Sequence, residues 1–357
     1  MHIYQLLPTI SYGDAVSNDT LALQQVIKKM GFKSEIYAES VDIRLPKGTA
    51  KSVSKLPKLS EDDVVIYHMS TGAQLNWDFG KMNCKKVMVY HNITPPEYLE
   101  RYNSRAALQC SEGIRALRYL SDKVDYCLAV SEYNKQDLIE LGFKCKIDVL
   151  PILIPFSDYD KEPDTSLMRR YEADACTNIL FTGRLAPNKC QEDVIKSFAE
   201  YKKNYNPASR LILVGSDSGS ENYRKRLESF AYALEVKDDI IFAGHIKFNQ
   251  ILSYYRMADV FLCMSEHEGF CVPLVEAMYF NIPIIAYDSS AIYGTLGGSG
   301  IVLSTKDSLE VAGVIDKVVK DKALRDKLIA NEKERLKDFS HEVIEERFIS
   351  LMKENVL

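Results

Sequence analysis

The stretch VFLCMSEHEGFCVPLVEAM, residues 260–278, decides the fold. Its first five residues, Val260–Met264, are apolar and predict a short buried strand, and SEHEGF predicts a polar loop. Pro273 predicts the first turn of a helix, because its fixed φ suits that position. Strand, loop and helix therefore follow one another, as they do in the repeating unit of an α/β protein.

The loop and helix start in this stretch are suited to bind a phosphate and a sugar. Unpaired N–H groups at a helix N-terminus attract anions, and Gly269 allows a ligand to approach the backbone closely. Glu268 and Glu276 lie eight residues apart around this junction, and a carboxylate can accept hydrogen bonds from vicinal hydroxyls. Acidic residues near a helix start are also common for structural reasons. This stretch alone leaves both interpretations open.

A second segment, NILFTGRLAPNKCQEDVIKSF (residues 178–198), favours the ligand site. It predicts a strand at Ile179–Thr182, a loop that carries Arg184 and Lys189, and a helix from about Gln191. Ligands of open α/β sheets bind outside the carboxyl ends of the strands, and a diphosphate there needs positive charge. The alternative is a solvated basic loop. Because the same pattern recurs downstream with acids in place of bases, we favour phosphate binding.

These segments resemble glycosyltransferase family 4, the retaining nucleotide-sugar enzymes of the GT-B fold. The resemblance covers nearly the whole C-terminal half and implies two Rossmann-like, doubly wound α/β domains that face a central cleft. It rests on five motifs in family order: GRLAPNK (183–189), RLILVGSDSG (210–219), DDIIFAGHI (238–246), YYRMADVFLCMSEHEGFCVPLVEAM (254–278) and NIPIIAY (281–287).

The resemblance implies roles for individual residues. Glu268 would contact the donor sugar, Glu276 would hold the nucleotide ribose, and Arg184 and Lys189 would grip the diphosphate. Further residues expected at the donor are Gly13, Gly244, His245, Gly269, Phe270, Cys271 and Val272. The chain departs from the family where glycine is common, because it has Cys190, Cys271 and Asn281 there. These departures put the local backbone geometry in doubt but remove no charged contact.

The remainder of the chain predicts the domain organisation. With 357 residues the chain has room for two domains. Apolar strands and helices alternate up to Pro155, and the pattern resumes at Asn178. We predict a first Rossmann-like, acceptor-side domain over residues 1–155 and a second, nucleotide-sugar-binding domain over 156–339. The resemblance implies that residues 340–357 form a helix that crosses back to the first domain.

The first domain offers candidate residues at the ends of predicted strands. The loop YGDAVSND (12–19) lacks the GxGxxG spacing of a dinucleotide fold, which counts against an NAD-dependent oxidoreductase. Gly13 and Asp14 in this loop are candidates for contacts with donor and acceptor, although a simple capped turn is equally compatible. His91 ends the strand KVMVY, and the resemblance implies that it lies beside the donor sugar as a catalytic residue, together with Glu268, Arg184 and Lys189. His68 and Ser70 end a neighbouring strand and are predicted on the acceptor side.

The composition limits the kinds of partner and cofactor that we expect for this protein. The formal net charge of -5 and the lack of a strongly basic face argue against nucleic acid. Eight cysteines without a CxxC pair indicate reduced thiols, and neither a signal peptide nor an apolar run of membrane length is evident. We therefore expect a cytoplasmic protein. No obvious DxD motif accompanies the donor residues, so we expect no metal and no other cofactor.

Two basic segments raise the question of membrane contact. Cations alternate with leucine and isoleucine over residues 101–123, and lysines and arginines recur over residues 44–58. Docking on an anionic membrane, at the inner face of the plasma membrane, and a solvated amphipathic surface both fit this pattern. The cations are Arg44, Lys47, Lys51, Lys55, Lys58, Arg101, Arg105, Arg115, Arg118 and Lys123.

The resemblance implies a metal-independent, retaining hexosyltransferase. The preferred donor is GDP-mannose, with UDP- and dTDP-sugars as alternatives, and the expected acceptor is a glycan or lipid-linked glycan of bacterial surface polysaccharide or lipopolysaccharide synthesis. A sugar phosphorylase or sugar-phosphate synthase of the same fold is the nearest alternative. A non-catalytic sugar-nucleotide binding protein belongs to a different class and stays open.

Overall fold

A computed structural model describes residues 1–172 and 175–357 of the chain. The chain divides into two compact units, which are described separately. The first unit contains Met1–Pro96, Arg105–Phe156 and Asp338–Leu357, and the second contains Glu97–Ser104 and Ser157–Lys337. Residues 97–104, which the sequence placed in the first domain, thus group with the second unit.

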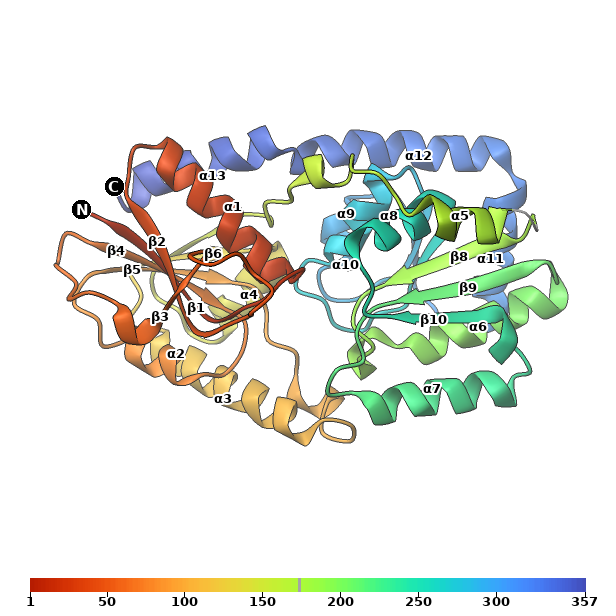
Figure 1. The fold of residues 1–357 in the computed structure, drawn as a ribbon, viewed down its shortest axis with the longest axis horizontal. Helices are drawn as coiled ribbons and strands as arrows, with labels where there is room; N and C mark the ends of the chain where they lie inside the picture. Colours follow the sequence, from red (N-terminus) through yellow and green to blue (C-terminus); the bar gives the residue numbers. More distant parts are fainter. Residues whose placement is uncertain (173–174) are drawn as a thin grey trace. The chain divides into compact units, whose positions relative to one another are not determined.

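The first unit is built on a seven-stranded parallel sheet (Figure 1). Its strands in sequence order are β1 (Ile3–Ile10), β2 (Ser34–Val41), β3 (Lys51–Ser52), β4 (Val64–Met69), β5 (Lys85–Tyr90), β6 (Tyr126–Ala129) and β7 (Lys146–Val149). They lie in the order β3-β2-β1-β4-β5-β6-β7, so the winding reverses between β1 and β4. All six residues of β4 are buried, as expected for a strand with helices on both faces.

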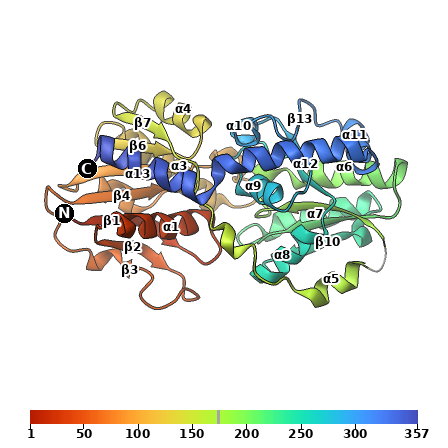
Figure 2. The same cartoon turned by 90° about the horizontal axis from the view of Figure 1, so that it is seen from above.

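Helices cover both faces of this sheet. They are α1 (Ala15–Lys29), α2 (Gln74–Phe79), α3 (Ser104–Leu120), α4 (Glu132–Glu140) and α13 (His341–Asn355), with a short 3₁₀ turn at Val53–Lys55. Two further 3₁₀ turns, Pro96–Tyr98 and Phe156–Asp158, contain residues of both units. α1 and α13 lie side by side on one face, where Lys29 Nζ lies 2.7 Å from Glu345 Oε2, and α2 and α3 lie on the other (Figures 1 and 2). The last helix of the chain therefore packs in the first unit.

The second unit has a six-stranded parallel sheet in the order β10-β9-β8-β11-β12-β13. Its strands are β8 (Thr177–Thr182), β9 (Ser209–Val214), β10 (Ile240–Gly244), β11 (Val260–Cys263), β12 (Ile284–Tyr287) and β13 (Ile301–Leu303). The two segments that dominate the sequence prediction become β8 and β11, which pair directly with each other. The winding reverses between them, and such a switch point opens a crevice at the carboxyl ends of the strands.

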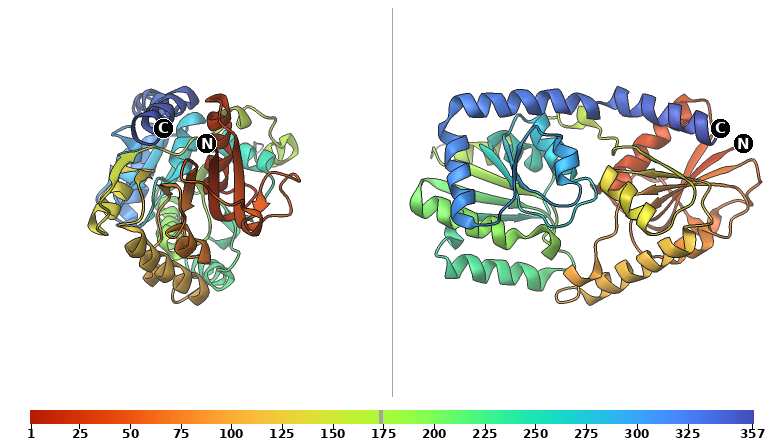
Figure 3. Two further views of the ribbon diagram at one scale, coloured as in Figure 1. Left: turned by 90° about the vertical axis from the view of Figure 1, so that its left-hand side faces the viewer. Right: turned by 180° about the vertical axis from the view of Figure 1, so that it is seen from behind.

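The helices of the second unit are α5 (Thr165–Glu172), α6 (Gln191–Asn204), α7 (Glu221–Ala233), α8 (Phe248–Met257), α9 (Val272–Tyr279), α10 (Ile292–Leu296), α11 (Ser308–Lys320) and α12 (Lys322–Leu336). Short 3₁₀ turns lie at Pro187–Lys189 and Lys237–Asp239, and a further one, Lys337–Phe339, contains residues of both units. α6 and α7 lie on one face of the sheet, and α8 and α9 lie on the other (Figures 1 and 3). Within the described residues, no helix combines the length and the apolar character that crossing a membrane requires.

Candidate functional site

In the second unit, the loop after β8 and the loop after β11 are joined by an ion pair. Lys189 Nζ donates a hydrogen bond to Glu268 Oε2, and both side chains are largely buried. The backbone supports the pair, because Asn188 Nδ2 donates to the carbonyl of His267 (3.0 Å) and the N–H of Glu266 donates to the carbonyl of Asn188 (2.9 Å). Two residues that the sequence predicts at one ligand are therefore in direct contact.

A residue of a third loop also holds Glu268. Arg184, in contrast, has an exposed side chain. The N–H of Glu268 donates to Ser290 Oγ (2.8 Å), which fixes the backbone beside the carboxylate. Arg184 is exposed, while its carbonyl accepts a hydrogen bond from Gln191 Nε2 (2.9 Å). The backbone of Arg184 is thus anchored, and its guanidinium is accessible to a ligand anion.

Two glycines bring the loops after β8 and β9 into backbone contact. The N–H of Gly183 donates to the carbonyl of Val214 (2.9 Å), and a Cβ on Gly215 would lie 1.8 Å from the carbonyl oxygen of Gly183. The N–H of Gly215 also donates to the carbonyl of Gly244, the last residue of β10 (3.2 Å). Only glycine fits at position 215, and the three loops form one continuous edge.

The three departures from glycine keep the backbone geometry of glycine. Cys190, Cys271 and Asn281 have φ values of 49°, 70° and 58°, in the left-handed region that favours glycine. Cys190 and Cys271 directly precede α6 and α9, so the positive φ turns the chain into each helix. The local backbone that was in doubt from the sequence is therefore compatible with a glycine-type turn at all three positions.

The start of α9 carries the remaining donor-site candidates of this stretch. Gly269, Phe270 and Cys271 are buried, and Val272 is the first helical residue, one position before the predicted Pro273. The carbonyl of Phe270 accepts a hydrogen bond from Thr295 Oγ1 (2.5 Å). Another candidate, His245, is exposed directly after β10.

Glu276 accepts hydrogen bonds from two tyrosines. Tyr159 Oη donates to Oε1 (2.7 Å) and Tyr255 Oη donates to Oε2 (2.5 Å). Thr182 Oγ1 lies 2.6 Å from Tyr255 Oη and donates to it, because the tyrosine hydrogen is directed at the carboxylate. Burial raises the pKa of Glu276, and the two tyrosine hydroxyls partly offset that effect. The two hydrogen bonds thus hold the carboxylate in one orientation, and each oxygen keeps a lone pair that can accept another hydrogen bond.

In the first unit, the loop after β1 is a capped helix start. Gly13 has a φ of 75°, and Asp14 caps α1 by accepting hydrogen bonds from the N–H (3.0 Å) and Oγ (2.9 Å) of Ser17. Ser70 is half-buried directly after β4. Asp14 therefore has a structural task, and its predicted contact with an acceptor stays a prediction.

His91 and His68 form a buried cluster with Asp19. His68 Nδ1 lies 3.0 Å from His91 Nε2, and Asp19 Oδ2 lies 3.8 Å from the same His91 nitrogen. Burial lowers the pKa of both histidines, that of His91 to about 3, and raises the pKa of Asp19 to about 7. His68 is fully buried with both ring nitrogens engaged. This geometry favours a positioning role for His68 over direct contact with an acceptor.

These three side chains also offer atoms that could hold a metal ion, since they lie within 4.8 Å of one another. Cys263, Glu268 and Cys271 form a second such group. In the first group the two histidines are at hydrogen-bond distance, and in the second Glu268 is paired with Lys189. In both groups, contacts within the protein account for the close approach of these side chains.

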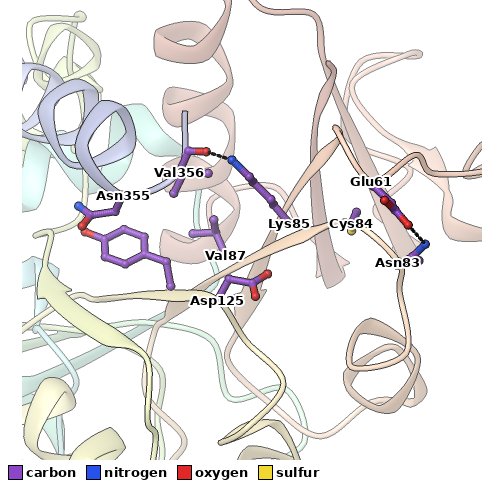
Figure 4. Close-up of a pocket in the computed structure, with 9 residues that line it drawn as sticks. Glu61, Asn83, Cys84, Lys85, Val87, Asp125, Asn355 and Val356 are labelled. Carbon is purple, nitrogen blue, oxygen red and sulfur yellow. Dashed lines mark hydrogen bonds between the residues drawn. The ribbon is translucent and has the colours of Figure 1, made fainter.

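A cavity of about 420 Å³ lies elsewhere in the first unit (Figure 4). Lys85 begins β5 and Tyr126 begins β6, so this cavity lies at the amino ends of the strands. Figure 4 shows Lys85 reaching toward Val356, whose carbonyl accepts from its Nζ (2.6 Å). The cavity therefore lies at the opposite end of the strands from His91, and Asn355 and Val356 near the C-terminus line it.

Several residues at the site carry no local sequence signal. Tyr159 and Tyr255 are 117 and 21 residues from Glu276, and Ser290 is 22 residues from Glu268. Lys306 bridges Asp193 (2.9 Å) and Glu266 (2.7 Å) beside the same loops. These contacts depend on tertiary folding alone.

The chain is similar to known glycosyltransferases. Residues 173–335 match the family model described as glycosyl transferases group 1. D-inositol 3-phosphate glycosyltransferase of Acidothermus cellulolyticus is 30% identical over 44% of this chain and 36% of its own. The O-antigen chain mannosyltransferase of Salmonella typhimurium is 30% identical over 32% of this chain and 31% of its own. This chain thus aligns with about a third of the length of each of these two relatives.

The structure of the Anabaena protein HepE in complex with UDP and glucose superposes with a TM-score of 0.78 and 18% identity, over 99% of both chains. The fold is therefore GT-B, with two Rossmann-like domains. Together with the family match, the relatives support a GT-B glycosyltransferase.

Proposed function

We propose that this protein transfers a hexose from a nucleoside diphosphate sugar to a hydroxyl of a glycan or lipid-linked glycan, with retention of anomeric configuration. The observation that carries the proposal is the contact between Lys189 and Glu268 at the point where the winding of the second sheet reverses. A cation for a phosphate and a carboxylate for sugar hydroxyls lie together there, beside the exposed Arg184.

Arg184, Lys189 and the N–H groups at the start of α9 would stabilise the departing diphosphate. Negative charge grows on the leaving group in the transition state, and fixed donors aimed at that charge lower the barrier. These groups would take the place of a divalent ion, so the proposal includes no metal cofactor. The acceptor would attack from the face that the diphosphate leaves, and the departing phosphate would help to take the acceptor proton.

Glu276 would accept hydrogen bonds from the ribose hydroxyls. Each carboxylate oxygen can accept two hydrogen bonds, and the tyrosines occupy one on each oxygen. The tyrosines would thus orient Glu276 without blocking it. Mannose is the preferred hexose, because an O-antigen chain mannosyltransferase is among the relatives, and synthesis of bacterial surface polysaccharide is the proposed setting.

We also propose a cytoplasmic location and contact with anionic lipid at the first unit. Ile43 is 98% exposed next to Arg44, and Leu108 is 63% exposed on α3, which carries Arg105 and Arg115. Exposed apolar side chains beside cations suit an anionic bilayer surface. Co-sedimentation with vesicles of phosphatidylglycerol but not of phosphatidylcholine would support this contact. Equal absence from both pellets would contradict it.

The first experiment is ligand-induced stabilisation with GDP-, UDP-, ADP- and dTDP-sugars, followed by a transfer assay with the sugar that binds. A ligand at a hundredfold its Kd adds about 2.7 kcal/mol of stability. The shift should disappear in Glu276→Ala and persist in Glu334→Ala, whose side chain is 73% exposed on α12. Turnover that requires orthophosphate or a sugar phosphate would favour a phosphorylase or synthase. Binding without transfer to any acceptor would favour a binding protein.

A further inference from the structure

We infer that Gln5 and His68 are positioning residues that hold His91 in one tautomer, with its hydrogen on Nε2 and its Nδ1 as a buried hydrogen-bond acceptor. Gln5 lies on β1, His68 on β4, and His91 directly follows β5. These strands are neighbours in the sheet, so the three side chains can form a chain of hydrogen bonds across it.

The orientation of the Gln5 amide decides the first link. Gln5 Nε2 donates to the carbonyl of Thr20 (2.9 Å), which leaves Oε1 facing His68 Nε2 at 2.9 Å. An amide oxygen accepts hydrogen bonds and cannot donate. His68 Nε2 must therefore carry the hydrogen.

The second link follows from the first. Burial keeps His68 neutral, so its Nδ1 has a lone pair and accepts. His91 Nε2 lies 3.0 Å from that nitrogen and must be the donor. Since His91 is also kept neutral by burial, its hydrogen is on Nε2 and its Nδ1 is an acceptor.

Asp19 reinforces this assignment. Its Oδ1 accepts from the N–H of Leu153 (2.8 Å), and its Oδ2 lies 3.8 Å from His91 Nε2. The carboxyl group is 2% exposed and cannot turn away to solvent. When Asp19 is ionised, its oxygen near Nε2 favours the tautomer that carries its hydrogen there.

The end of the chain of hydrogen bonds is unsatisfied. His91 Nδ1 is buried and has no hydrogen-bond partner among the residues that the structure describes. A buried acceptor without a partner is costly, so a ligand that donates a hydrogen bond to Nδ1 gains from filling the position. This step rests on the proposed function, under which the group that donates to Nδ1 is a sugar hydroxyl. A group that only accepts, such as the carboxylate of a hexuronic acid, would be rejected.

The tautomer can be measured without any substrate. Long-range ¹H–¹⁵N spectra of protein labelled with [¹⁵N]histidine distinguish the two ring nitrogens, and His91→Gln assigns the signals among the six histidines. We expect His91 with hydrogen on Nε2 in the wild type and in Gln5→Glu, whose carboxyl group, protonated in this buried position, can donate to the Thr20 carbonyl and keep an acceptor for His68. Gln5→Met should give a mixture of tautomers. Hydrogen on Nδ1 in the wild type would overturn the inference.

A transfer assay tests the consequence for specificity. Gln5→Met should lower kcat for a neutral hexose donor by about tenfold, the size of one lost hydrogen bond, with nucleotide affinity unchanged and activity restored in Gln5→Glu. The wild type should transfer a hexose at least tenfold faster than the matching hexuronic acid; equal rates would overturn the specificity claim. If no sugar nucleotide is a substrate, the proposed function fails while the tautomer result still stands.

A metal ion would be a different explanation of the same cluster. Elemental analysis of the purified protein should find no stoichiometric metal bound at Asp19, His68 and His91. A metal that is present in the wild type and lost in Asp19→Asn would overturn the hydrogen-bond chain.

Discussion

Lys189 and Glu268 form an ion pair that joins the loop after β8 to the loop after β11. Under the proposed function, Lys189 serves the diphosphate and Glu268 serves the sugar. While they are paired, each reduces the charge that the other presents to a ligand. Affinity for the nucleotide and turnover should therefore respond differently when the pair is broken.

Glu268→Gln removes the negative charge and keeps the size of the side chain. Lys189 then presents its full charge to the diphosphate, so we expect affinity for the nucleoside diphosphate to rise about two- to tenfold. Transfer should fall by about a hundredfold, because the sugar loses its orienting carboxylate. Calorimetric titration of the nucleoside diphosphate and initial rates measure the two effects.

The matched control is Glu266→Gln, two residues away on the same loop, where the side chain is 41% exposed and paired with Lys306. It should leave affinity and rate within about twofold, since Glu266 is partly exposed to solvent and Lys306 keeps its second partner, Asp193. If Glu268→Gln transferred sugar at the wild-type rate, the assigned role of Glu268 would be wrong.

The tyrosines at Glu276 provide a second test. Tyr255→Phe removes the donor to Oε2 and leaves Thr182 without its acceptor. We expect nucleotide affinity to fall about three- to tenfold, because Glu276 loses one of the two hydrogen bonds that orient it. Titration with the nucleotide compares this variant with Tyr232→Phe, whose hydroxyl is on a side chain 74% exposed to solvent. Equal affinities in the two variants would show that Tyr255 does not orient Glu276.

The sequence predicted strands well where the run is short and mostly apolar, whereas β3 (Lys51–Ser52), which is polar and exposed, carries no such signal. The run VVIYHM is β4, fully buried, and the predicted helix start near Gln191 is where α6 begins. Such strands can be recognised from the local sequence alone, because strands of a parallel sheet are buried on both faces and are therefore apolar throughout. The GT-B fold, which the resemblance implied, is confirmed by the structural similarity.

Contacts between distant segments could not be predicted in the same way. The sequence assigned His68 and His91 to different tasks, yet they share one hydrogen bond across 23 residues. Residues 97–104 group with the second unit, where Tyr102 packs edge-on against Tyr223. Neither contact has a periodic signature, because each depends on how separate loops meet after folding.

Asn281 allows a test of backbone strain outside the binding site. It is exposed with a φ of 58°, and it follows Phe280, the C-cap residue of α9. Glycine adopts this conformation without steric cost, so Asn281→Gly should stabilise the protein by about 0.5 kcal/mol, after allowance for the entropy of the unfolded chain. Asn281→Ala should destabilise it by about 1 kcal/mol. Urea unfolding measures both changes.

The control for this comparison is Asn204→Gly at the end of α6, where glycine should lower stability by up to about 1 kcal/mol. Opposite signs at the two positions are the expected result. Destabilisation of similar size by glycine at both positions would show that the left-handed conformation of Asn281 costs little.

Glu332 on α12 predicts a pH dependence of stability. Its side chain is fully buried, Oε1 accepts from the N–H of Ile284 (2.9 Å), and burial raises its pKa to about 8, partly offset by that hydrogen bond. The unfolded chain loses this proton near its ordinary pKa of 4.5, whereas the folded protein keeps it up to about pH 8. Stability from Glu332 is therefore complete below pH 4.5 and is lost as the pH rises through 8.

Glu332→Gln removes this titration and nearly keeps the shape of the side chain. Relative to the wild type, the variant should gain stability on the order of 3 kcal/mol between pH 5 and pH 8, because each unit of pKa difference corresponds to about 1.4 kcal/mol. The difference in Tm between variant and wild type, measured at both pH values, cancels the titration of all other groups. Glu334→Gln, on the exposed side of the same helix, should show no such change. A Tm difference for Glu332→Gln that stays constant from pH 5 to pH 8 would mean that Glu332 ionises alike in the folded and unfolded chain.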